Sequence, residues 1–462
     1  MGSSTARTRP HRAWAWVLGV VVSLTTLVAV AWPWWCARAI EARLQSWVRA
    51  SDPDGEWVWR QLVHERGWLR SQGSVELVVR ARCSPDPALR QGGVLRLNYA
   101  LLHWPTWQSA SQFSWQLRPA DSAQGQLIRR LLGTTLPATG EGTLGWDRSL
   151  HSSFHLPAWR LEAAQSHWRG APSHGELHWN EDGLKLQAKV GQWRAQHGDG
   201  AITGRSLSLS LNLPMAPNSL GDLSLQLADL RGDDWQLQGL SVDTQIRRQG
   251  AHLSTKWRQR VQRLQWREWG LRDLQLDFAL REIDQAGSAT LAGLFSQSCR
   301  LERLADRDAQ RWLAAWRRVL SHGLKLDVSQ VAGHINGRSG QVGRVQGRWS
   351  LGLLPSPATG PLHLVESLVS QGELSIQGDV LPPTLHDSAL ASGYFRATAE
   401  GLQGHYSYAQ GRLSVAGQTE ALPHFQALLN MLDKAIPAWL TPTPATPQPE
   451  NREPDLPPPS VD

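Results

Sequence analysis

The sequence predicts a mainly β protein: a long antiparallel meander or curved sheet with few helices, behind a single N-terminal transmembrane helix. Three observations predict this class. An uncharged apolar stretch opens the chain, apolar and polar residues alternate over most of the remainder, and helical periodicity is confined to a few short segments. A chain of 462 residues is ample for a sizeable core.

Residues 13–37 form the predicted membrane anchor. The stretch exceeds the roughly 20 apolar residues that cross a bilayer. Interfacial tryptophans flank both of its ends, at Trp14 and Trp16 and at Trp32, Trp34 and Trp35. Residues 1–12 form a short basic tail that we expect in the cytoplasm. The prediction is a single-pass protein of the bacterial inner membrane, N-terminus inside, with its C-terminal domain in the periplasm.

A cleaved signal peptide is the alternative for the same segment. Ala29-Val30-Ala31 has the small-x-small pattern of a cleavage site, and the preceding tail is basic. The apolar run continues through that site and Pro33 follows it closely, which favours the uncleaved anchor. Both alternatives export the domain that follows.

Residues 38–55 are predicted to form a stalk helix, and residues 56–440 a periplasmic β-rich domain. Ser206 to Leu213, Leu223 to Leu227 and Leu274 to Leu280 alternate without fault. A period of two places one apolar and one polar face on each strand. Asp182-Gly183 is one of several turn signals that make neighbouring runs into hairpins.

Two helices are predicted within this domain. Residues 301–322 carry an apolar stripe, with acidic residues early and basic residues late, in the order that suits the helix dipole. Residues 423–436 carry a second stripe behind Pro423. Residues 441–462 are rich in proline and polar residues, which predicts a disordered tail.

The charge pattern argues against nucleic acid as a partner. The net charge is +7, but the arginines are scattered and no run of five basic residues occurs. The 25 tryptophans accompany abundant Arg, Ala, Gly and Pro, as a GC-rich coding bias would give. We therefore do not interpret the tryptophan count by itself as a stacking surface.

No motif for catalysis, metal binding or cofactor binding occurs. His174 and His178 are four residues apart, as are His151 and His155, but such residues on a strand are roughly 13 Å apart. That separation is too long for one metal ion. Nucleophile-elbow and phosphate-loop motifs are absent. We predict no enzyme, no cofactor and no metal.

Cysteine usage leaves one candidate disulfide. Cys36 lies at the membrane edge, and no CxxC motif occurs. Cys83 and Cys299 could pair in an oxidising periplasm, although the sequence does not test their geometry.

Three stretches stand out in order along the chain: Ile40-Glu41 with Leu44 after the predicted span, His64 to Ser71 with Arg66 and Gly67 at the start of the first long strand, and Tyr406 to Gln418 with Gly411 and Gly417 near the end. They are similar to the stalk, the start of the first long strand and the closing hairpin of a known family. That family is the bacterial inner-membrane proteins typified by YdgA and YihF, which share a domain of unknown function. The resemblance implies a periplasmic β-rich domain that self-associates, and carries over no activity.

Two functions fit these observations. One is a binding or scaffold module whose partner is another envelope protein or a second copy of the chain. The other is an envelope protein that binds or handles lipids in an apolar β-groove. The deciding feature is whether the apolar face of the sheet closes on itself or stays open.

Overall fold

The computed structural model describes most of the predicted periplasmic domain. The described residues are 32–33, 37–42, 44–46, 48–51, 55–80, 90, 92–107, 109–132, 138–163, 166–198, 200–215, 219–297, 306–336, 342–355, 367–378, 380–381, 383–410, 412–415 and 431. Most of the predicted anchor and the whole 441–462 tail lie outside them. Within these ranges, no helix combines the length and the apolar character that a membrane crossing requires.

The described chain is mainly strands. In the predicted stalk, residues 37–42, 44–46 and 48–50 are helical. The first half then contains β1 (Trp57–Glu65), β2 (Arg70–Val79), β3 (Gly93–Leu102), β4 (Ser111–Pro119), α3 (Ala123–Leu132), β5 (Ala138–Leu144), β6 (Leu150–Leu156), β7 (Trp159–Ala163), β8 (Ser166–Gly170), β9 (Ser173–Asn180), β10 (Gly183–His197), β11 (Gly200–Pro214) and β12 (Ser219–Arg231).

The second half contains β13 (Trp235–Gln249), β14 (His252–Trp266), β15 (Trp269–Asp284), α4 (Gln285–Gln297), α5 (Asp306–Ser321), β16 (Leu324–Asn336), β17 (Val342–Leu353), β18 (Leu368–Gln377), α7 (Pro383–Ala391), β19 (Phe395–Thr398), β20 (Gly401–Ala409) and β21 (Arg412–Val415). The prediction of a mainly β antiparallel meander with few helices is confirmed.

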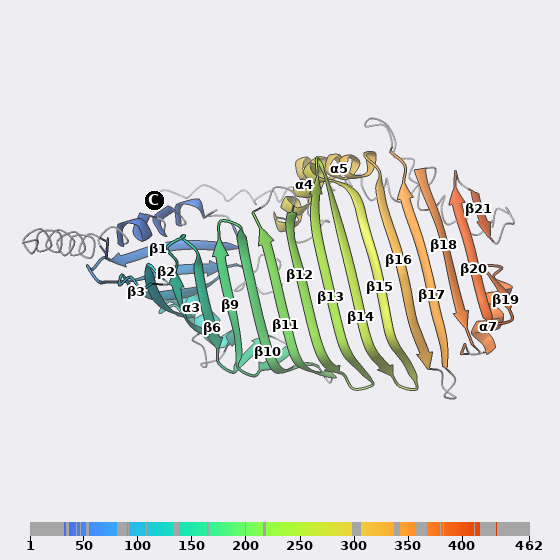
Figure 1. Cartoon of the computed structure of the whole chain (residues 1–462), viewed down its shortest axis with the longest axis horizontal. Coiled ribbons are helices and arrows are strands. Elements are labelled where there is room, and N and C mark those ends of the chain that lie inside the picture. Colours follow the sequence, from blue (N-terminus) through green and yellow to red (C-terminus); the bar gives the residue numbers. More distant parts are fainter. Residues whose placement is uncertain are drawn as a thin grey trace, which may run out of the picture.

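All these strands belong to one sheet, and every pairing in it is antiparallel (Figure 1). β1 to β6 pair in chain order, β6 pairs with β9, and β9 to β18 again pair in chain order. The β7–β8 hairpin pairs with the far end of β10. β18 pairs with β20, whose outer edge carries both β19 and β21. Sequential hairpins therefore build nearly the whole molecule.

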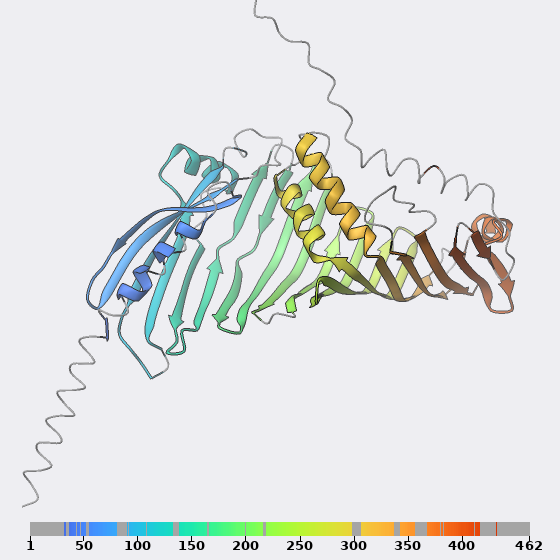
Figure 2. The same ribbon diagram turned by 90° about the horizontal axis from the view of Figure 1, so that it is seen from above.

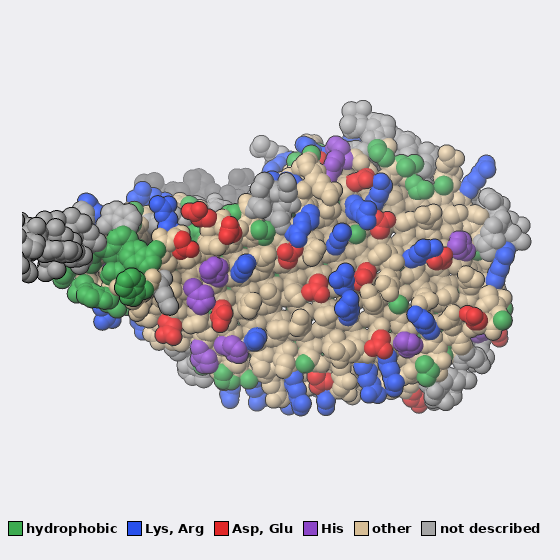
Figure 3. All heavy atoms as spheres, in the orientation of Figure 1, with side chains coloured by type: hydrophobic (Ala, Val, Ile, Leu, Met, Phe, Trp, Pro, Cys, Tyr) green, Lys and Arg blue, Asp and Glu red, His purple; other side chains and the backbone are tan. Residues whose placement is uncertain are grey.

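Alternation divides the sheet into two faces. One cross-strand row runs from β9 to β20 and consists almost entirely of apolar residues: Leu177, Leu186, Leu211, Leu223, Thr244, Trp257, Phe278, Val328, Trp349, Gly372 and Tyr406. We call the surface that these residues share the apolar face. The opposite, polar face carries mixed acidic, basic and histidine side chains along the sheet (Figure 3).

The alternation breaks at one level of the sheet, which we call the crease. On β13 the apolar residues Leu240 and Val242 follow the normal alternation. Past Gly239 the apolar series continues at Leu237 rather than at position 238, so the alternation is shifted by one residue. Gly239 has φ +63°, and Ser206 on β11 and Asp273 on β15 lie at the same level with φ +53° and +51°. The pairing register continues through the break because neighbouring strands shift phase together.

Two prolines extend the crease to earlier strands. The register in which β6 pairs with β9 continues past Pro157 and Pro172 as the register in which β7 pairs with β8. In the same way, β9 and β8 pair with β10 in one continuous register on either side of Pro172. Proline lacks the amide hydrogen that the ladder needs, so a strand stops there. The crease thus runs from β6 to β15, and left-handed residues or prolines at such points bend and twist a sheet.

Helices α4 and α5 form a pair near the middle of the sheet, at the level of the β15 terminus (Figures 1 and 2). Leu291 and Leu294 pack against Trp312, Ala315 and Val319 across the pair. Asp284 is almost fully buried; its carboxylate accepts a 2.6 Å hydrogen bond from Gly287 N and lies 2.8 Å from Arg318 Nε. One carboxylate thus caps α4 and joins it to α5. Helix α5 lies within the predicted 301–322 range; α3, α4 and α7 were not predicted.

Candidate functional site

The apolar face stays open along much of its length. Leucines at its centre keep intermediate exposure although they pair with apolar neighbours across the strands. Leu213, Leu223 and Trp349 are 38%, 39% and 42% exposed. A sheet that closed into a barrel or sandwich would bury these side chains. The feature left undecided by the sequence is therefore an open face within the described residues.

The chemistry of this face is uniform. Among the described residues that pair from β9 to β18 on the side of the crease that contains β9, the apolar rows contain Ser173, Thr244, Thr255, Gln259 and Ser370 as polar exceptions and Arg248 as a charged one. Aliphatic and aromatic carbon dominates between them. Such a surface makes no directional bonds and favours an apolar ligand through the hydrophobic effect.

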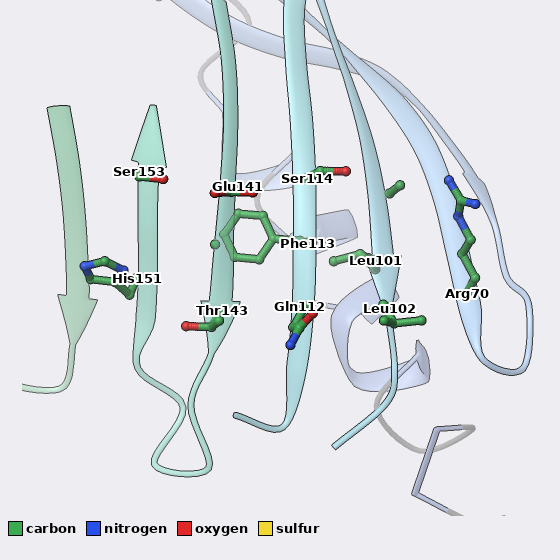
Figure 4. A pocket seen from close by; sticks show the side chains of 12 residues that line it. Arg70, Leu101, Leu102, Gln112, Phe113, Ser114, Glu141, Thr143, His151 and Ser153 are labelled. Atoms are coloured by element: carbon green, nitrogen blue, oxygen red, sulfur yellow. The ribbon is translucent and has the colours of Figure 1, made fainter. Parts of the chain in front are cut away.

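The polar face has a hollow of about 590 Å³ over β2 to β6 (Figure 4). Two cross-strand rows supply most of its lining: Arg70, Leu102, Gln112, Thr143 and His151 in one, and Ala100, Ser114, Glu141 and Ser153 in the other. Glu141 and His151 are its titratable groups beside Arg70. The hollow is shallow and mixed in character, and its described lining residues form no hydrogen-bonded acid–base pair.

Four histidines pair across strands on the same face. His151 on β6 lies opposite His178 on β9 with 6.1 Å between ring centroids, and His155 lies opposite His174. Spacing along the sequence relates only histidines four residues apart on one strand, so it did not reveal these cross-strand pairs. The register of β6 with β9, across the intervening hairpin, was the information needed. No group of three or more metal-ligating side chains exists in the described part of the chain.

Two of the three family-like stretches meet where the stalk reaches the sheet. Glu41 Oε2 and Arg66 Nη1 lie 3.5 Å apart, which links the stalk to the turn before β2. His64 Nδ1 lies 2.9 Å from the hydroxyl of Tyr99. Burial raises the pKa of Tyr99 to about 12, with Glu41 adding to the effect. Burial lowers the pKa of His64, an effect that Glu41 opposes and Arg66 reinforces.

Ser71 and His103 resemble a nucleophile–base pair in spacing alone. Their Oγ and Nε2 atoms are 2.7 Å apart, and both side chains have no exposed surface. A nucleophile must reach its substrate, so this pair holds β2 to the segment after β3. Gly67 is also explained by packing, because a Cβ there would lie 2.1 Å from the Arg70 carbonyl oxygen.

The predicted site residues divide into described and undescribed positions. Trp14, Trp16, Trp34, Trp35, Cys83, Cys299, Gly411 and Gly417 lie outside the described residues. Trp32 contacts the domain: its indole nitrogen lies 3.4 Å from the Ala110 carbonyl oxygen, and its ring lies 4.7 Å from that of Trp146. Tyr406 belongs to a small cluster around buried Tyr408 and Leu413. The disulfide and the membrane positions stay predictions.

The fold and its open face define a class of protein: a chain built on one long antiparallel sheet, with one apolar and one polar side. Residues 14–423 match the family of bacterial proteins of unknown function DUF945, and the chain belongs to that family. The expected family relationship is confirmed at this level. No curated protein matches the chain. No solved structure matches it.

Proposed function

We propose that this protein binds the acyl chains of envelope lipids along the apolar face of its sheet. The anchor predicted for residues 13–37 would hold it at the periplasmic side of the bacterial inner membrane. The observation that carries the proposal is the open apolar row from Leu177 to Tyr406, which charged side chains do not interrupt.

The hydrophobic effect favours the binding of an apolar ligand on this face over its exposure to water. Each methylene group removed from water contributes about 0.8 kcal/mol, and the face offers partly exposed leucines on strand after strand. A strand of 15 residues such as β10 is about 50 Å long. That length exceeds the ~15 Å of one bilayer leaflet's hydrocarbon, so acyl chains fit along it in extended form.

The scaffold function, with a protein partner, has less support. Non-obligate protein interfaces combine an apolar centre with polar groups that fix the register of the partner. The apolar face carries such groups mainly on β13 and β14 and offers few of them on the neighbouring strands β10 to β12 and β15 to β17. A flexible ligand without a fixed register suits this chemistry better than a folded partner does.

Mass spectrometry of lipids that copurify with the full chain tests the proposal. The chain is purified in a detergent that removes loosely bound lipid, beside an unrelated single-span periplasmic protein. We expect phospholipid at one or more molecules per chain, well above that control. Equal lipid content in the two proteins would contradict the proposal, and in-cell cross-linking would then address a protein partner.

A further inference from the structure

The part of the sheet beyond the crease differs in composition from the rest. We call it the lower panel, after its place in Figure 1: β7, β8 and the segments 193–197, 200–205, 229–231, 235–238, 263–266 and 269–272. It contains the hairpins that join β10 to β11, β12 to β13 and β14 to β15. Tryptophan and arginine gather there on opposite sides.

The apolar side of the lower panel is rich in tryptophan. Trp235, Trp266 and Trp269 lie directly opposite one another on β13, β14 and β15. The rings of Trp168 and Trp193 stack with centroids 6.0 Å apart. Trp159 completes the set, and its ring covers Gly170, where a Cβ would lie 2.1 Å away. Trp168 and Trp266 are 38% and 58% exposed.

The polar side of the same panel is rich in arginine. Arg160, Arg169 and Arg194 lie opposite one another on β7, β8 and β10. A second row crosses β14 to β17 at the crease and ends beyond the panel: Arg263, Arg272, His334 and Arg344. Figure 3 shows basic side chains along this edge of the molecule.

These arginines face each other, and acidic side chains on the same side of the panel are fewer: Glu162 lies two residues from Arg160, opposite His167. The carboxylates of Asp229 and Asp234 pair with Arg231 and Arg267. Within the described residues, Arg160, Arg169 and Arg194 form no salt bridge with an acidic side chain. Like charges directly opposite on neighbouring strands are destabilising, so an anionic partner at this edge would relieve a cost that the isolated protein bears.

One sequence pattern produces both sides at once. Trp159-Arg160, Trp168-Arg169 and Trp193-Arg194 are three Trp–Arg pairs on neighbouring strands. Consecutive residues on a strand point to opposite faces, so each pair places its indole on the apolar side and its guanidinium on the polar side. An edge with indoles on one side and guanidinium groups on the other matches the boundary between hydrocarbon and phosphate in a bilayer.

We propose that the lower panel docks edge-on to a membrane surface that contains anionic phospholipid. The tryptophans lie at the hydrocarbon boundary, and the arginines contact lipid phosphates. Docking places the open apolar face next to the bilayer, so that an acyl chain could move between them with little exposure to water. The docking itself does not require lipid to bind along the sheet, so the two proposals can fail separately.

Vesicle flotation tests the docking. The full chain, held in phosphatidylcholine nanodiscs, is mixed with vesicles of phosphatidylcholine alone or with 30% phosphatidylglycerol. We expect at least tenfold tighter binding to the anionic vesicles and loss of this preference at high salt, since exposed charges are screened. The triple variant R160E/R169E/R194E should lose at least tenfold of that binding.

A matched variant separates location from net charge. Lys185, Lys189 and Lys256 are exposed on the polar face on the other side of the crease, so K185E/K189E/K256E makes the same charge change outside the panel. We expect its binding to stay within twofold of the parent protein. The W168A/W266A variant should also bind severalfold more weakly, and circular dichroism should show that all variants fold.

Three outcomes would overturn the docking proposal. One is equal binding to neutral and anionic vesicles. Another is an equal loss in the lysine and arginine variants, which would indicate a diffuse charge effect. The third is tighter binding of the protein, through the Arg160, Arg169 and Arg194 row, to single-stranded DNA than to anionic vesicles at the same salt concentration. Copurified lipid is measured on the same variants, and a docking-deficient chain that still carries lipid leaves the lipid-binding proposal intact.

Discussion

Ser71 Oγ and His103 Nε2 lie 2.7 Å apart with both side chains fully buried, and this contact joins β2 to the segment that follows β3. Burial lowers the pKa of His103 below its ordinary 6.5, and nearby His64 lowers it further. The folded state therefore binds fewer protons than the unfolded state just below pH 6.5. The contact belongs to the same region as the Glu41–Arg66 pair, where the stalk meets the sheet.

The first prediction concerns pH. Because His103 has a lowered pKa when folded, its contribution to stability is complete above about pH 6.5 and falls as the pH drops towards that lowered pKa. We expect the thermal midpoint to fall between pH 7 and pH 5, by roughly 2–4 °C for each kcal/mol lost. In H103Q the thermal midpoint should depend less on pH, and the dependence that remains should come from His64, whose pKa is also lowered. H386Q, a control at a position away from the stalk, should show the same pH dependence of the thermal midpoint as the parent protein. If H103Q also showed the parent's pH dependence, the effect could not be assigned to His103.

The second prediction concerns the apolar face. Leu209 and Leu225 are directly opposite on β11 and β12, and Ser210 and Ser224 are the matching pair on the polar face. L209D/L225D places two carboxylates where acyl chains are proposed to lie, and should reduce copurified lipid at least fivefold. S210D/S224D makes the same charge change one residue away and should leave the lipid content near that of the parent. Equal effects would show that the face is not the lipid site.

The third prediction concerns the crease. Gly239 has φ +63°, a left-handed conformation that costs other residues about 1–2 kcal/mol. A Cβ there would also meet the Gln262 side chain at 2.3 Å, which a flexible glutamine can relieve. G239A should destabilise the protein by about that amount in urea unfolding. G191A at the same level should be close to neutral, because a Cβ there would meet its nearest neighbour at an ordinary 3.5 Å and the φ of Gly191 lies outside the left-handed region.

Much of the fold could be predicted from local patterns. Fault-free alternation, as in Ser206 to Leu213, predicted strands with one wet and one apolar face, and the pairing of Leu207, Leu209 and Leu211 with β12 confirms it. The sequence did not show that two runs out of phase form a single 15-residue strand, because a broken alternation is more often the end of a strand. Helix α4 was missed because its Ala, Gly and Ser residues give little periodic contrast.

The site was harder to predict than the fold. The opposition of His151 to His178 depends on the pairing of β6 with β9, which the β7–β8 hairpin separates in the chain. The Trp–Arg pairs are visible in the sequence, but only the pairing of β7, β8 and β10 shows that they lie side by side. The sequence could not show that the apolar face stays open. Alternation indicates that each strand has one apolar side, but not whether a second layer of the protein covers that side.

The crease also constrains how the sequence can change. A one-residue insertion in a simple strand inverts every side chain beyond it, and here the phase already changes at a level that neighbouring strands share. An insertion or deletion on the hairpin side of Gly239 would turn Trp235 towards the polar face and Gln236 towards the apolar face, while the rest of the strand kept its orientation. Segment lengths between the crease and the hairpins should therefore tolerate changes of two residues far better than changes of one.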